Sequence, residues 1–298
     1  MKKILIIGCG LLGSSLLRRI QKKKIANKIY IYEKSKSCIA KIKRLKLPGI
    51  IVKRLEEGVK KSDLIILCTP MSEYKNLILK MNKFLSPRTI MTDIGSSKIE
   101  SSKIIKKFLR KDIFWIQSHP IAGSEVSGPE HGKQDIFENK WCVLIKEKNT
   151  KKIHLNVLNK FWKKIGSKVV VMTPEKHDKI FSITSHLPHL IAYNLVKSAQ
   201  DFEKIQNFDL IKYSAGGLRD FSRIAASNEI MWRDIFFNNK QNISRAIDLF
   251  IKNLNSFKKD INSKNNKSIL KKLIQTKKVR SKIIKLKQDI NKPDFGRN

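Results

Sequence analysis

Long apolar runs are missing from this chain of 298 residues. Nowhere do about 18 apolar residues follow one another, so we expect no transmembrane helix. The apolar opening at residues 4–7 is too short for the core of a secretory signal peptide, and it leads directly into glycines. We therefore expect neither a membrane protein nor a secreted one.

Cysteine is also scarce, and its spacing excludes the usual cysteine-based sites. The chain has four cysteines, far apart in sequence: Cys9, Cys38, Cys68 and Cys142. They form no C-x-x-C pair, so neither a disulfide framework nor a zinc site is expected from them. His186 and His189 are three residues apart, but no cysteine or carboxylate set completes a metal site around them. We predict reduced thiols, a cytoplasmic location and no metal.

Acidic residues are few: 25 against 63 lysines and arginines, for a formal net charge of +38. Only 12 of the basic residues are arginine, and the 51 lysines are spread over the whole length. Nucleic-acid binders concentrate their charge and often use arginine for bidentate hydrogen bonding. The spread of lysine favours a solvated surface, so we expect no nucleic-acid or membrane partner. The alternative, a basic nucleic-acid or membrane-surface binder, predicts charge clustered on one face and no cofactor.

Short apolar runs alternate with amphipathic segments over the first 172 residues. Helical spacing is clear at residues 11–22. Strands are expected at residues 3–7, 29–32, 63–69, 89–93, 113–116, 141–145 and 168–172. Because such alternation is typical of a parallel, doubly wound sheet, we predict a Rossmann-type α/β domain.

The pattern changes after Thr173-Pro174, which is a typical helix start. No strand pattern follows. Helices are expected at residues 174–199, 201–212, 228–262 and 266–290. We predict two domains: residues 1–172 as an NAD(P)-binding Rossmann-like domain and residues 173–298 as an all-helical domain. Analogy with other folds gives the second domain a role in substrate binding and dimerisation.

A glycine motif directly follows the first predicted strand and opens the first predicted helix. Gly8, Gly10 and Gly13 fit G-x-G-x-x-G in the context that a dinucleotide site requires. In such a site the first glycine permits a tight turn, the second lets the main chain approach a pyrophosphate, and the third allows close packing. The alternative is a glycine-rich turn in an FAD or other nucleotide protein. Thr69-Pro70, at the end of another predicted strand, is expected to border the cofactor.

Glu33 lies 20 residues after Gly13, at the end of the second predicted strand. A carboxylate there accepts hydrogen bonds from ribose hydroxyls and repels a 2′-phosphate, which favours NAD. Lys34 and Lys36 follow and tolerate a phosphate, so NADP is not excluded.

Hydride transfer to a nicotinamide needs a base, for which the candidates are His119, His131, His177, His186 and His189, and His119 is preferred. We expect it in a loop just after the strand at 113–116, at the sheet edge where ligands bind. Ser96, after the strand at 89–93, is expected beside it. A capping or turn role for His119 remains the alternative. His131 lies in the glycine-rich continuation of this loop and is expected to be solvent-facing.

Two segments of the helical half combine histidine, glycine and arginine. SHLPH spans residues 185–189, and GGLRDFSR spans residues 216–223. Arginine in a lysine-rich chain indicates bidentate recognition of a carboxylate. The alternative is an ion pair with Asp220 or Asp234, which fits Arg219 or Arg233 better than Arg223.

Together these motifs resemble the prephenate and arogenate dehydrogenase family of tyrosine biosynthesis. The resemblance runs through GCGLLGSS, DIGSSK, SHPIAGSEVSGPEHG, FENKWCVL, TPEKHDKIFSITSHLPHLIAY and GGLRDFSRIAASNEIMWRDI. It implies a homodimer with a Rossmann domain and a helical dimerisation domain. No ACT-like tail is expected after the helices, so any feedback by tyrosine is expected at the active site.

The resemblance also implies site residues. His119 matches the catalytic histidine and Ser96 its serine partner. His189 and Arg223 match substrate contacts, and Ser185 and Trp232 match further pocket positions. The glycine motif and the neighbouring strand ends separately predict the cofactor contacts Gly8, Gly10, Leu11, Leu12, Gly13, Glu33, Thr69 and Pro70.

The implied reaction is the oxidative decarboxylation of prephenate or arogenate, with a neutral His119 as the base. The sequence does not decide between these two substrates. Another two-domain dehydrogenase, of the 3-hydroxyacid or 6-phosphogluconate type, is the nearest rival. Those enzymes use a catalytic lysine in the helical domain, which SHLPH and GGLRDFSRIA do not supply.

Overall fold

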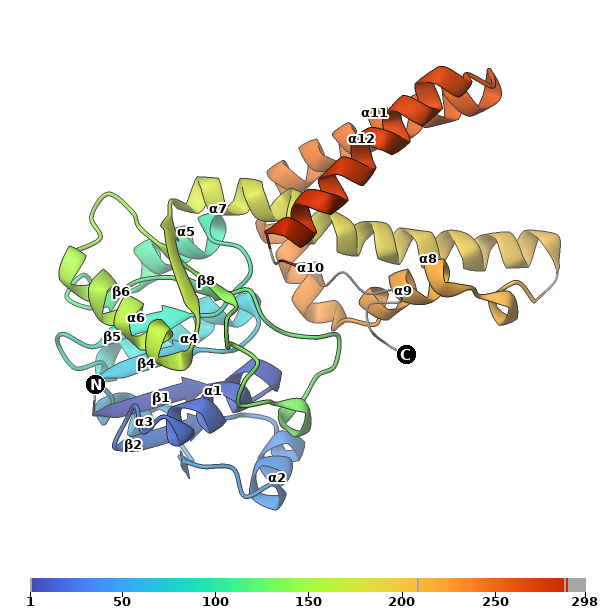
Figure 1. The fold of residues 1–298 in the computed structure, drawn as a ribbon. Helices are drawn as coiled ribbons and strands as arrows, with labels where there is room; N and C mark the ends of the chain where they lie inside the picture. The colour runs from blue at the N-terminus through green and yellow to red at the C-terminus, as the bar shows by residue number, and fades with distance from the viewer. Residues whose placement is uncertain (1, 208, 287, 289–298) are drawn as a thin grey trace. The chain divides into compact units, whose positions relative to one another are not determined.

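The computed structural model describes residues 2–207, 209–286 and 288 (Figure 1). These residues form two compact units, Met1–Ile243 and Ser244–Asn298, which we describe separately. The predicted domains 1–172 and 173–298 stay a prediction.

The first unit is built on a six-stranded sheet in which every neighbouring pair is parallel. Its strands, in chain order, are β1 (Lys3–Ile7), β2 (Lys28–Tyr32), β3 (Ile50–Ile51), β4 (Leu64–Leu67), β5 (Ile90–Asp93) and β6 (Phe114–Trp115). The spatial order is β3-β2-β1-β4-β5-β6, so the direction of winding reverses between β1 and β4. Ligands of open α/β sheets bind at the carboxyl ends of the strands at such a point.

Helices cover both faces of this sheet (Figure 1). They are α1 (Leu11–Lys22), α2 (Lys36–Arg44), α3 (Leu55–Lys60), α4 (Tyr74–Met81), α5 (Ile99–Phe108) and α6 (Lys152–Ile165). Ile4 and Ile6 of β1 pack with α1, α2 and α6, whereas Leu5 and Ile7 pack with α3, α4 and α5. Alternate residues of one strand thus supply two cores, as expected for a strand buried on both faces.

A second, three-stranded sheet contains β7 (Ser118–Pro120), β8 (Trp141–Ile145) and β9 (Lys168–Met172). β7 is antiparallel to β8, and β8 is parallel to β9. The expectation that 141–145 and 168–172 continue the parallel series is wrong, because an apolar pattern predicts a strand and not its partner. The loop predicted around His119 is also wrong, since His119 lies in β7, paired with Val143.

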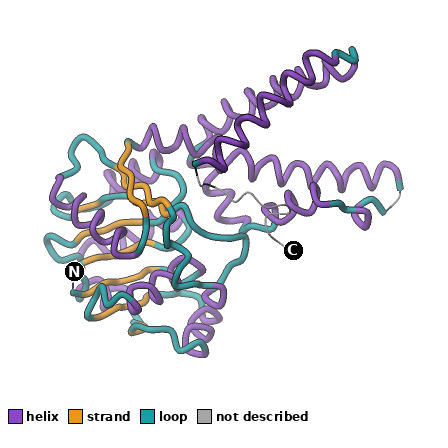
Figure 2. The backbone as a smooth tube through the Cα atoms, in the orientation of Figure 1, coloured by secondary structure: helices purple, strands orange, loops and turns teal. Residues whose placement is uncertain are grey.

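Helices follow β9, as predicted, and no strand follows it in the described residues (Figure 2). They are α7 (Pro174–Phe181), α8 (Leu187–Gln206), α9 (Gly216–Ala225), α10 (Glu229–Asn238), α11 (Lys240–Asn262) and α12 (Asn266–Lys285). The Thr173 hydroxyl accepts a hydrogen bond from the Lys176 amide, so the helix start predicted there is confirmed. The predicted Rossmann-type sheet followed by helices is therefore confirmed.

A π-helical turn at Ser182–His186 joins α7 to α8. Pro188 follows it and has no amide hydrogen to donate to the carbonyl of Thr184, which lies within the turn. The helix predicted at 174–199 is therefore interrupted, and α8 then runs on to Gln206. A separate helix at 201–212 is wrong, and the sequence did not predict α9.

The helix predicted at 228–262 divides at Asn239, a buried residue between α10 and α11. Within the second unit, Asp260 of α11 accepts hydrogen bonds from Ser268 and Lys272 of α12. The helix predicted at 266–290 ends at Lys285, and residues 287, 289 and 290 lie outside the described residues. No helix in the described part of the chain has the length and apolar character to cross a membrane.

Candidate functional site

The glycine turn after β1 has open space beside Gly10 and no space for a side chain at Gly13. Gly8 has φ +90°, a conformation that favours glycine. A Cβ at Gly13 would lie 2.2 Å from the carbonyl oxygen of Gly8, so only glycine lets α1 pack this closely on the turn. A Cβ at Gly10 would meet no atom within 4 Å. That space lies at the amino end of α1, where Leu11 and Leu12 begin the helix and where an anion is favoured.

Glu33 is fixed beside this turn. Its carboxylate accepts hydrogen bonds from the amides of Cys9 and Ser35, each at 2.9 Å. The side chain therefore bridges the end of β2 and the glycine turn. This is the position from which an acidic residue reaches the ribose of a dinucleotide.

Thr69 and Pro70 follow β4, the other strand at the reversal point. A Cβ at Gly8 would lie 3.0 Å from the Thr69 methyl carbon, so Thr69 adjoins the glycine turn. The Thr69 hydroxyl oxygen is buried and has no hydrogen-bond partner among the described residues. A buried hydroxyl without a partner, next to the glycine turn, fits a site for a polar cofactor such as a dinucleotide.

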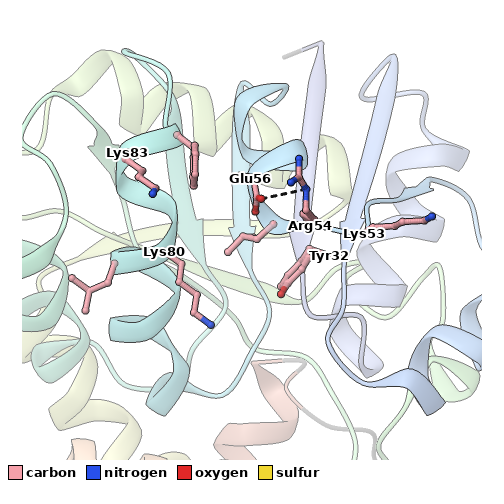
Figure 3. Close-up of a pocket in the computed structure, with 9 residues that line it drawn as sticks. Tyr32, Lys53, Arg54, Glu56, Lys80 and Lys83 are labelled. Atoms are coloured by element: carbon pink, nitrogen blue, oxygen red, sulfur yellow. Dashed lines mark ion pairs between the residues drawn. The ribbon is translucent and has the colours of Figure 1, made fainter.

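A hollow of about 530 Å³ lies beside Tyr32, the residue before Glu33 (Figure 3). Its lining residues are Tyr32, Lys53, Arg54, Leu55, Glu56, Leu79, Lys80, Lys83 and Phe84. Arg54 pairs with Glu56 at 3.3 Å, which leaves the three lysines in excess. The hollow is thus basic, and none of the residues predicted to bind substrate lines it.

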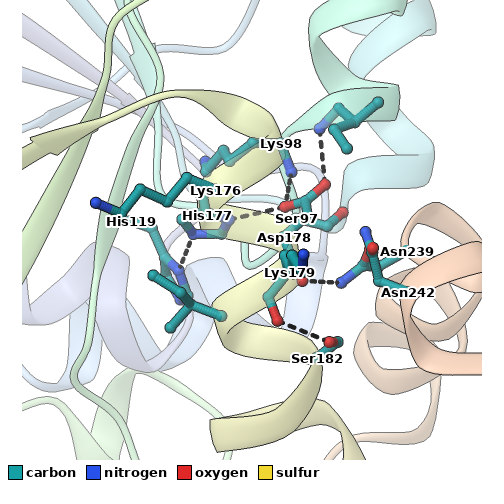
Figure 4. Close-up of polar contacts among 12 residues, drawn as sticks. Ser97, Lys98, His119, Lys176, His177, Asp178, Lys179, Ser182, Asn239 and Asn242 are labelled. Carbon is teal, nitrogen blue, oxygen red and sulfur yellow. Dashed lines mark hydrogen bonds and ion pairs between the residues drawn. The ribbon is translucent and has the colours of Figure 1, made fainter. Parts of the chain in front are cut away.

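His119 is buried in β7 and contacts a second histidine from the helical region. The Nδ1 atom of His119 lies 2.8 Å from the Nε2 atom of His177 in α7 (Figure 4). The ring of Phe181, one helical turn later, contacts both imidazoles, with centroids 4.9 Å from His119 and 4.5 Å from His177. The rings of His119, His177 and Phe181 therefore pack against one another at the start of the helical region.

Asp178 continues this series of contacts. Its Oδ1 atom lies 2.7 Å from the Nδ1 atom of His177 and accepts a hydrogen bond from the Lys98 amide at 2.8 Å. Its Oδ2 atom accepts from the Ile99 amide at 2.9 Å. Main-chain amides at the start of α5 thus hold the carboxylate, which in turn contacts His177 (Figure 4).

A buried ion pair supports the strand that carries His119. The Lys98 ammonium donates to a carboxylate oxygen of Asp93 and to the carbonyl of Ser118, both at 2.8 Å. The same oxygen of Asp93 accepts from the Tyr74 hydroxyl at 2.9 Å. Lys98, Asp93 and Tyr74 are fully buried. The end of β5, the start of α5 and the residue before His119 are therefore tied together.

The histidines of this region are held in the neutral form. Burial lowers the pKa of His119 well below its usual range, and the nearby His177, Lys98 and His186 lower it further. Burial likewise lowers the pKa of His177 well below its usual range, with further contributions from Lys98 and His186. His119 is thus available as a proton acceptor at neutral pH.

Ser96 lies in the connection between β5 and α5, at the carboxyl edge of the sheet, and is half-buried. The hydrogen bond at His119 Nδ1 involves His177, so the pairing of Ser96 with His119 stays a prediction. The main chain of Ser96 instead lies near His186, whose pKa burial lowers to about 4. Asn239 donates a hydrogen bond to the Nδ1 atom of His186 at 3.1 Å.

Three of the predicted substrate residues lie together. The Nδ1 atom of His189 donates to the carbonyl of Ser185 at 3.0 Å. The His189 ring stacks on Trp232 of α10, with centroids 3.8 Å apart. With Nδ1 engaged in this way, the Nε2 atom of a neutral His189 is a free acceptor.

Arg223 of α9 forms an ion pair with Glu125 of the segment after β7, at 3.0 Å. Its side chain remains half exposed. Of the alternative partners from the sequence, Asp234 pairs with Arg233. Arg223 thus faces the loop that follows the predicted catalytic histidine. The exposed position predicted for His131 is confirmed.

Several residues of this arrangement were not assigned a role from the sequence: Lys98, Glu125, His177, Asp178 and Asn239. A signal was present for two of them, because a histidine followed directly by an aspartate stands at the start of α7. The contact of His177 with His119 requires α7 to lie beside β7, which no local sequence pattern predicts. No group of three or more metal-binding side chains occurs in the described residues.

Residues 16–171 match the nucleotide-binding domain of prephenate dehydrogenase, and residues 173–276 match its dimerization domain. The chain belongs to the prephenate dehydrogenase family. The predicted resemblance is therefore confirmed, and the chain is an oxidoreductase of this family. Family membership favours this assignment over the other dehydrogenase types and over a nucleic-acid or membrane-surface binder.

Individual relatives are similar to this chain over most of its length. Cyclohexadienyl dehydrogenase of Zymomonas mobilis is 31% identical over 279 residues, 94% of this chain and 95% of that protein. Prephenate dehydrogenase of Bacillus subtilis is 31% identical over 260 residues, 86% of this chain and 69% of that protein. The crystal structure of prephenate dehydrogenase from A. aeolicus, in complex with hydroxyphenyl propionate and NAD+, is 33% identical with a TM-score of 0.88. It covers 95% of this chain and 98% of its own.

Proposed function

We propose that this enzyme catalyses the NAD-dependent oxidative decarboxylation of prephenate, of arogenate, or of both, in tyrosine biosynthesis. The products are 4-hydroxyphenylpyruvate and tyrosine, respectively. The observation that carries the proposal is a buried, neutral His119 in a member of the prephenate dehydrogenase family. A neutral imidazole is the state that a general base requires.

In the proposed reaction His119 accepts the proton of the ring hydroxyl through its Nε2 atom. As that C–O bond gains carbonyl character, the hydride leaves the same carbon, and bound NAD supplies the acceptor. The ring carboxylate departs as carbon dioxide, and the electrons of the broken C–C bond complete the aromatic ring. The ring oxygen then takes back the proton from His119 and becomes the phenolic hydroxyl of the product. Aromatisation makes the overall step effectively irreversible.

The substrate is proposed to lie between β7 and the helices that carry His189, Trp232 and Arg223. Arg223 binds one of its two carboxylates, for which a half-exposed guanidinium is suited. Ser96 and His189 orient the ring, and Ser185 supports His189 through the hydrogen bond to its carbonyl. Trp232 contributes the flat surface on which His189 stacks.

The cofactor is proposed to contact Gly8, Gly10, Leu11, Leu12, Gly13, Glu33, Thr69 and Pro70. Support comes from the open space at Gly10, the unpaired Thr69 hydroxyl and the fixed carboxylate of Glu33. Because that carboxylate disfavours a 2′-phosphate, NAD is the proposed cofactor. Lys34 already pairs with Glu73 at 2.9 Å, which weakens it as a partner for the phosphate of NADP.

A homodimer is proposed, since residues 173–276 match a dimerization domain. Exposed apolar side chains on α11 and α12 supply a surface for it, among them Leu249, Leu254, Leu270, Leu273 and Ile274. The proposed location is the cytoplasm, because all four cysteines are free thiols. The proposed domains remain 1–172 and 173–298.

A kinetic assay tests the reaction. Purified enzyme is given prephenate or arogenate, each with NAD or NADP, and reduced nicotinamide is followed by absorbance. We expect turnover with at least one pair, and loss of most turnover in His119→Asn with cofactor affinity nearly unchanged. Absence of reduced nicotinamide with both substrates and both cofactors would contradict the proposal.

A further inference from the structure

We propose that His177 and Asp178 are positioning residues that fix the tautomer of His119, so that Nε2 carries the lone pair. This inference rests on the proposed role of His119 as the base, and it adds two residues to the reaction. His177 and Asp178 need not touch the substrate. Their part is to decide which nitrogen of His119 accepts the proton.

The carboxylate of Asp178 fixes the first hydrogen in the series. The amides of Lys98 and Ile99 can only donate, so both oxygens of Asp178 act as acceptors. A third group, the Nδ1 atom of His177, lies 2.7 Å from Oδ1. At this distance from an acceptor the nitrogen must donate, so His177 carries its hydrogen on Nδ1.

The second hydrogen follows from the first. A neutral imidazole has one N–H group, so the Nε2 atom of His177 is an acceptor. It lies 2.8 Å from the Nδ1 atom of His119, which must then donate. His119 therefore carries its hydrogen on Nδ1, and its Nε2 atom holds the free lone pair that a general base needs.

The groups around the two rings favour this neutral state. Lys98 approaches from the start of α5, and its ammonium disfavours a second positive charge nearby. His186 approaches from the π-helical turn and is itself held neutral by burial. Among the described residues, Asp178 of α7 is the one carboxylate in contact with His177, and Phe181 contributes an uncharged ring. Burial of both imidazoles lowers their pKa in the same direction.

Both ends of the series are anchored, which keeps the geometry constant. At one end, Asn239 donates a hydrogen bond to the carbonyl of Asp178 at 2.8 Å. At the other, the Lys98 ammonium holds the carbonyl of Ser118, the residue before His119. A base whose donor and acceptor atoms are fixed before substrate arrives avoids reorganisation during the reaction.

Nitrogen NMR of the full-length wild-type enzyme, labelled with ¹⁵N at histidine, tests the assignment without any substrate. At neutral pH we expect both His119 and His177 to show a protonated Nδ1 and an unprotonated Nε2. A protonated Nε2 on either ring would overturn the proposal. Because this readout needs no turnover, a wild-type enzyme with these tautomers that oxidises neither substrate contradicts the proposed function alone and supports the tautomer assignment.

Two substitutions at His177 test the consequence for catalysis. His177→Phe fills the same space but offers no acceptor to His119 Nδ1, so we expect kcat to fall by about 10- to 100-fold. His177→Gln retains an oxygen that accepts this hydrogen bond, and we expect it to recover most of the loss. KM is expected to stay within about twofold of the wild-type value in both variants, since His177 does not bind the substrate.

The matched control is His154→Phe, on α6, where the histidine stacks on Phe114. It is expected to leave kcat unchanged. A His177→Phe enzyme as active as wild type, or a His177→Gln enzyme no better than His177→Phe, would overturn the positioning role. In a purely structural role Phe would serve at least as well as Gln at this buried position.

Discussion

The ammonium of Lys98 lies 2.8 Å from a carboxylate oxygen of Asp93, and neither side chain is exposed to solvent. Around this pair, the hydroxyl of Tyr74 and the amide of Gly95 donate to the same carboxylate oxygen. A buried pair of this kind is tolerated because each charge has its partner and further hydrogen bonds. Removal of one member leaves the other charge in the interior without compensation.

We accordingly predict that Lys98→Met destabilises the fold by about 3–5 kcal/mol. The measurement is urea unfolding of both proteins, followed by circular dichroism. Lys103→Met is the control, since Lys103 pairs with Glu100 on the exposed surface of α5 and is expected to change stability little. Equal stability of the two variants would contradict the importance of the buried pair.

The buried histidines predict a loss of stability in acid. The pKa values of His119 and His177 lie well below 6.5 in the folded state, and that of His186 is about 4. Between the unfolded and folded pKa values only the unfolded chain binds the proton, so stability is present above about pH 6.5 and falls as the pH drops. Each histidine contributes up to about 1.4 kcal/mol per pH unit. Melting temperatures measured from pH 7.5 to pH 4.5 check this, and a flat profile would contradict it.

Two glycines of the nucleotide turn are predicted to fail in different ways. Gly13→Ala places a methyl group 2.2 Å from the carbonyl oxygen of Gly8, so we expect a lower melting temperature. Gly10→Ala meets no atom within 4 Å and is expected to fold normally. Its methyl group instead occupies space proposed for the pyrophosphate, so the Kd for NAD should rise by about tenfold or more. Calorimetry of unfolding and of NAD binding separates the two effects.

Arg223→Ala is predicted to raise KM for the substrate by at least about tenfold, because the carboxylate loses its bidentate partner. Arg219→Ala, one turn earlier in α9, is the control and is expected to leave KM unchanged. Steady-state kinetics with the preferred substrate measures both. An unchanged KM in Arg223→Ala would mean that this guanidinium serves only its ion pair with Glu125.

The sheet and the nucleotide turn are predictable because each depends on a local pattern. Branched apolar runs predict β1, β2, β4 and β5 within a residue or two, and the glycine spacing predicts the turn between β1 and α1. The second sheet is not predictable in this way. A period of two residues says that 141–145 is extended, but the choice of β7 as its neighbour is decided by tertiary packing.

His119 was identifiable from its place after a strand, whereas its partners were not. Ser118 and His119 read as too polar for a buried strand, yet Asp93 and Thr92 satisfy the Ser118 hydroxyl and His177 satisfies the imidazole. Polarity in sequence therefore predicted a loop where hydrogen bonding permits a strand. The contact between His119 and His177 joins residues 58 positions apart, which no local pattern reports.

The π-helical turn at Ser182–His186 determines how α8 is rotated about its axis relative to α7. His177 and Asp178 lie before this turn, and His189 lies after it. If the same residues wound as regular α-helix with none removed, α8 would rotate by about 100° relative to α7, and His189 would turn away from Trp232. The π-helical turn therefore allows His177 and Asp178 of α7 to contact the region of His119 while His189 of α8 stacks on Trp232. A residue inserted in a surface loop often has no effect on the rest of the fold. A residue inserted in this turn would rotate α8 relative to α7 and change the position of His189 relative to His177 and Asp178.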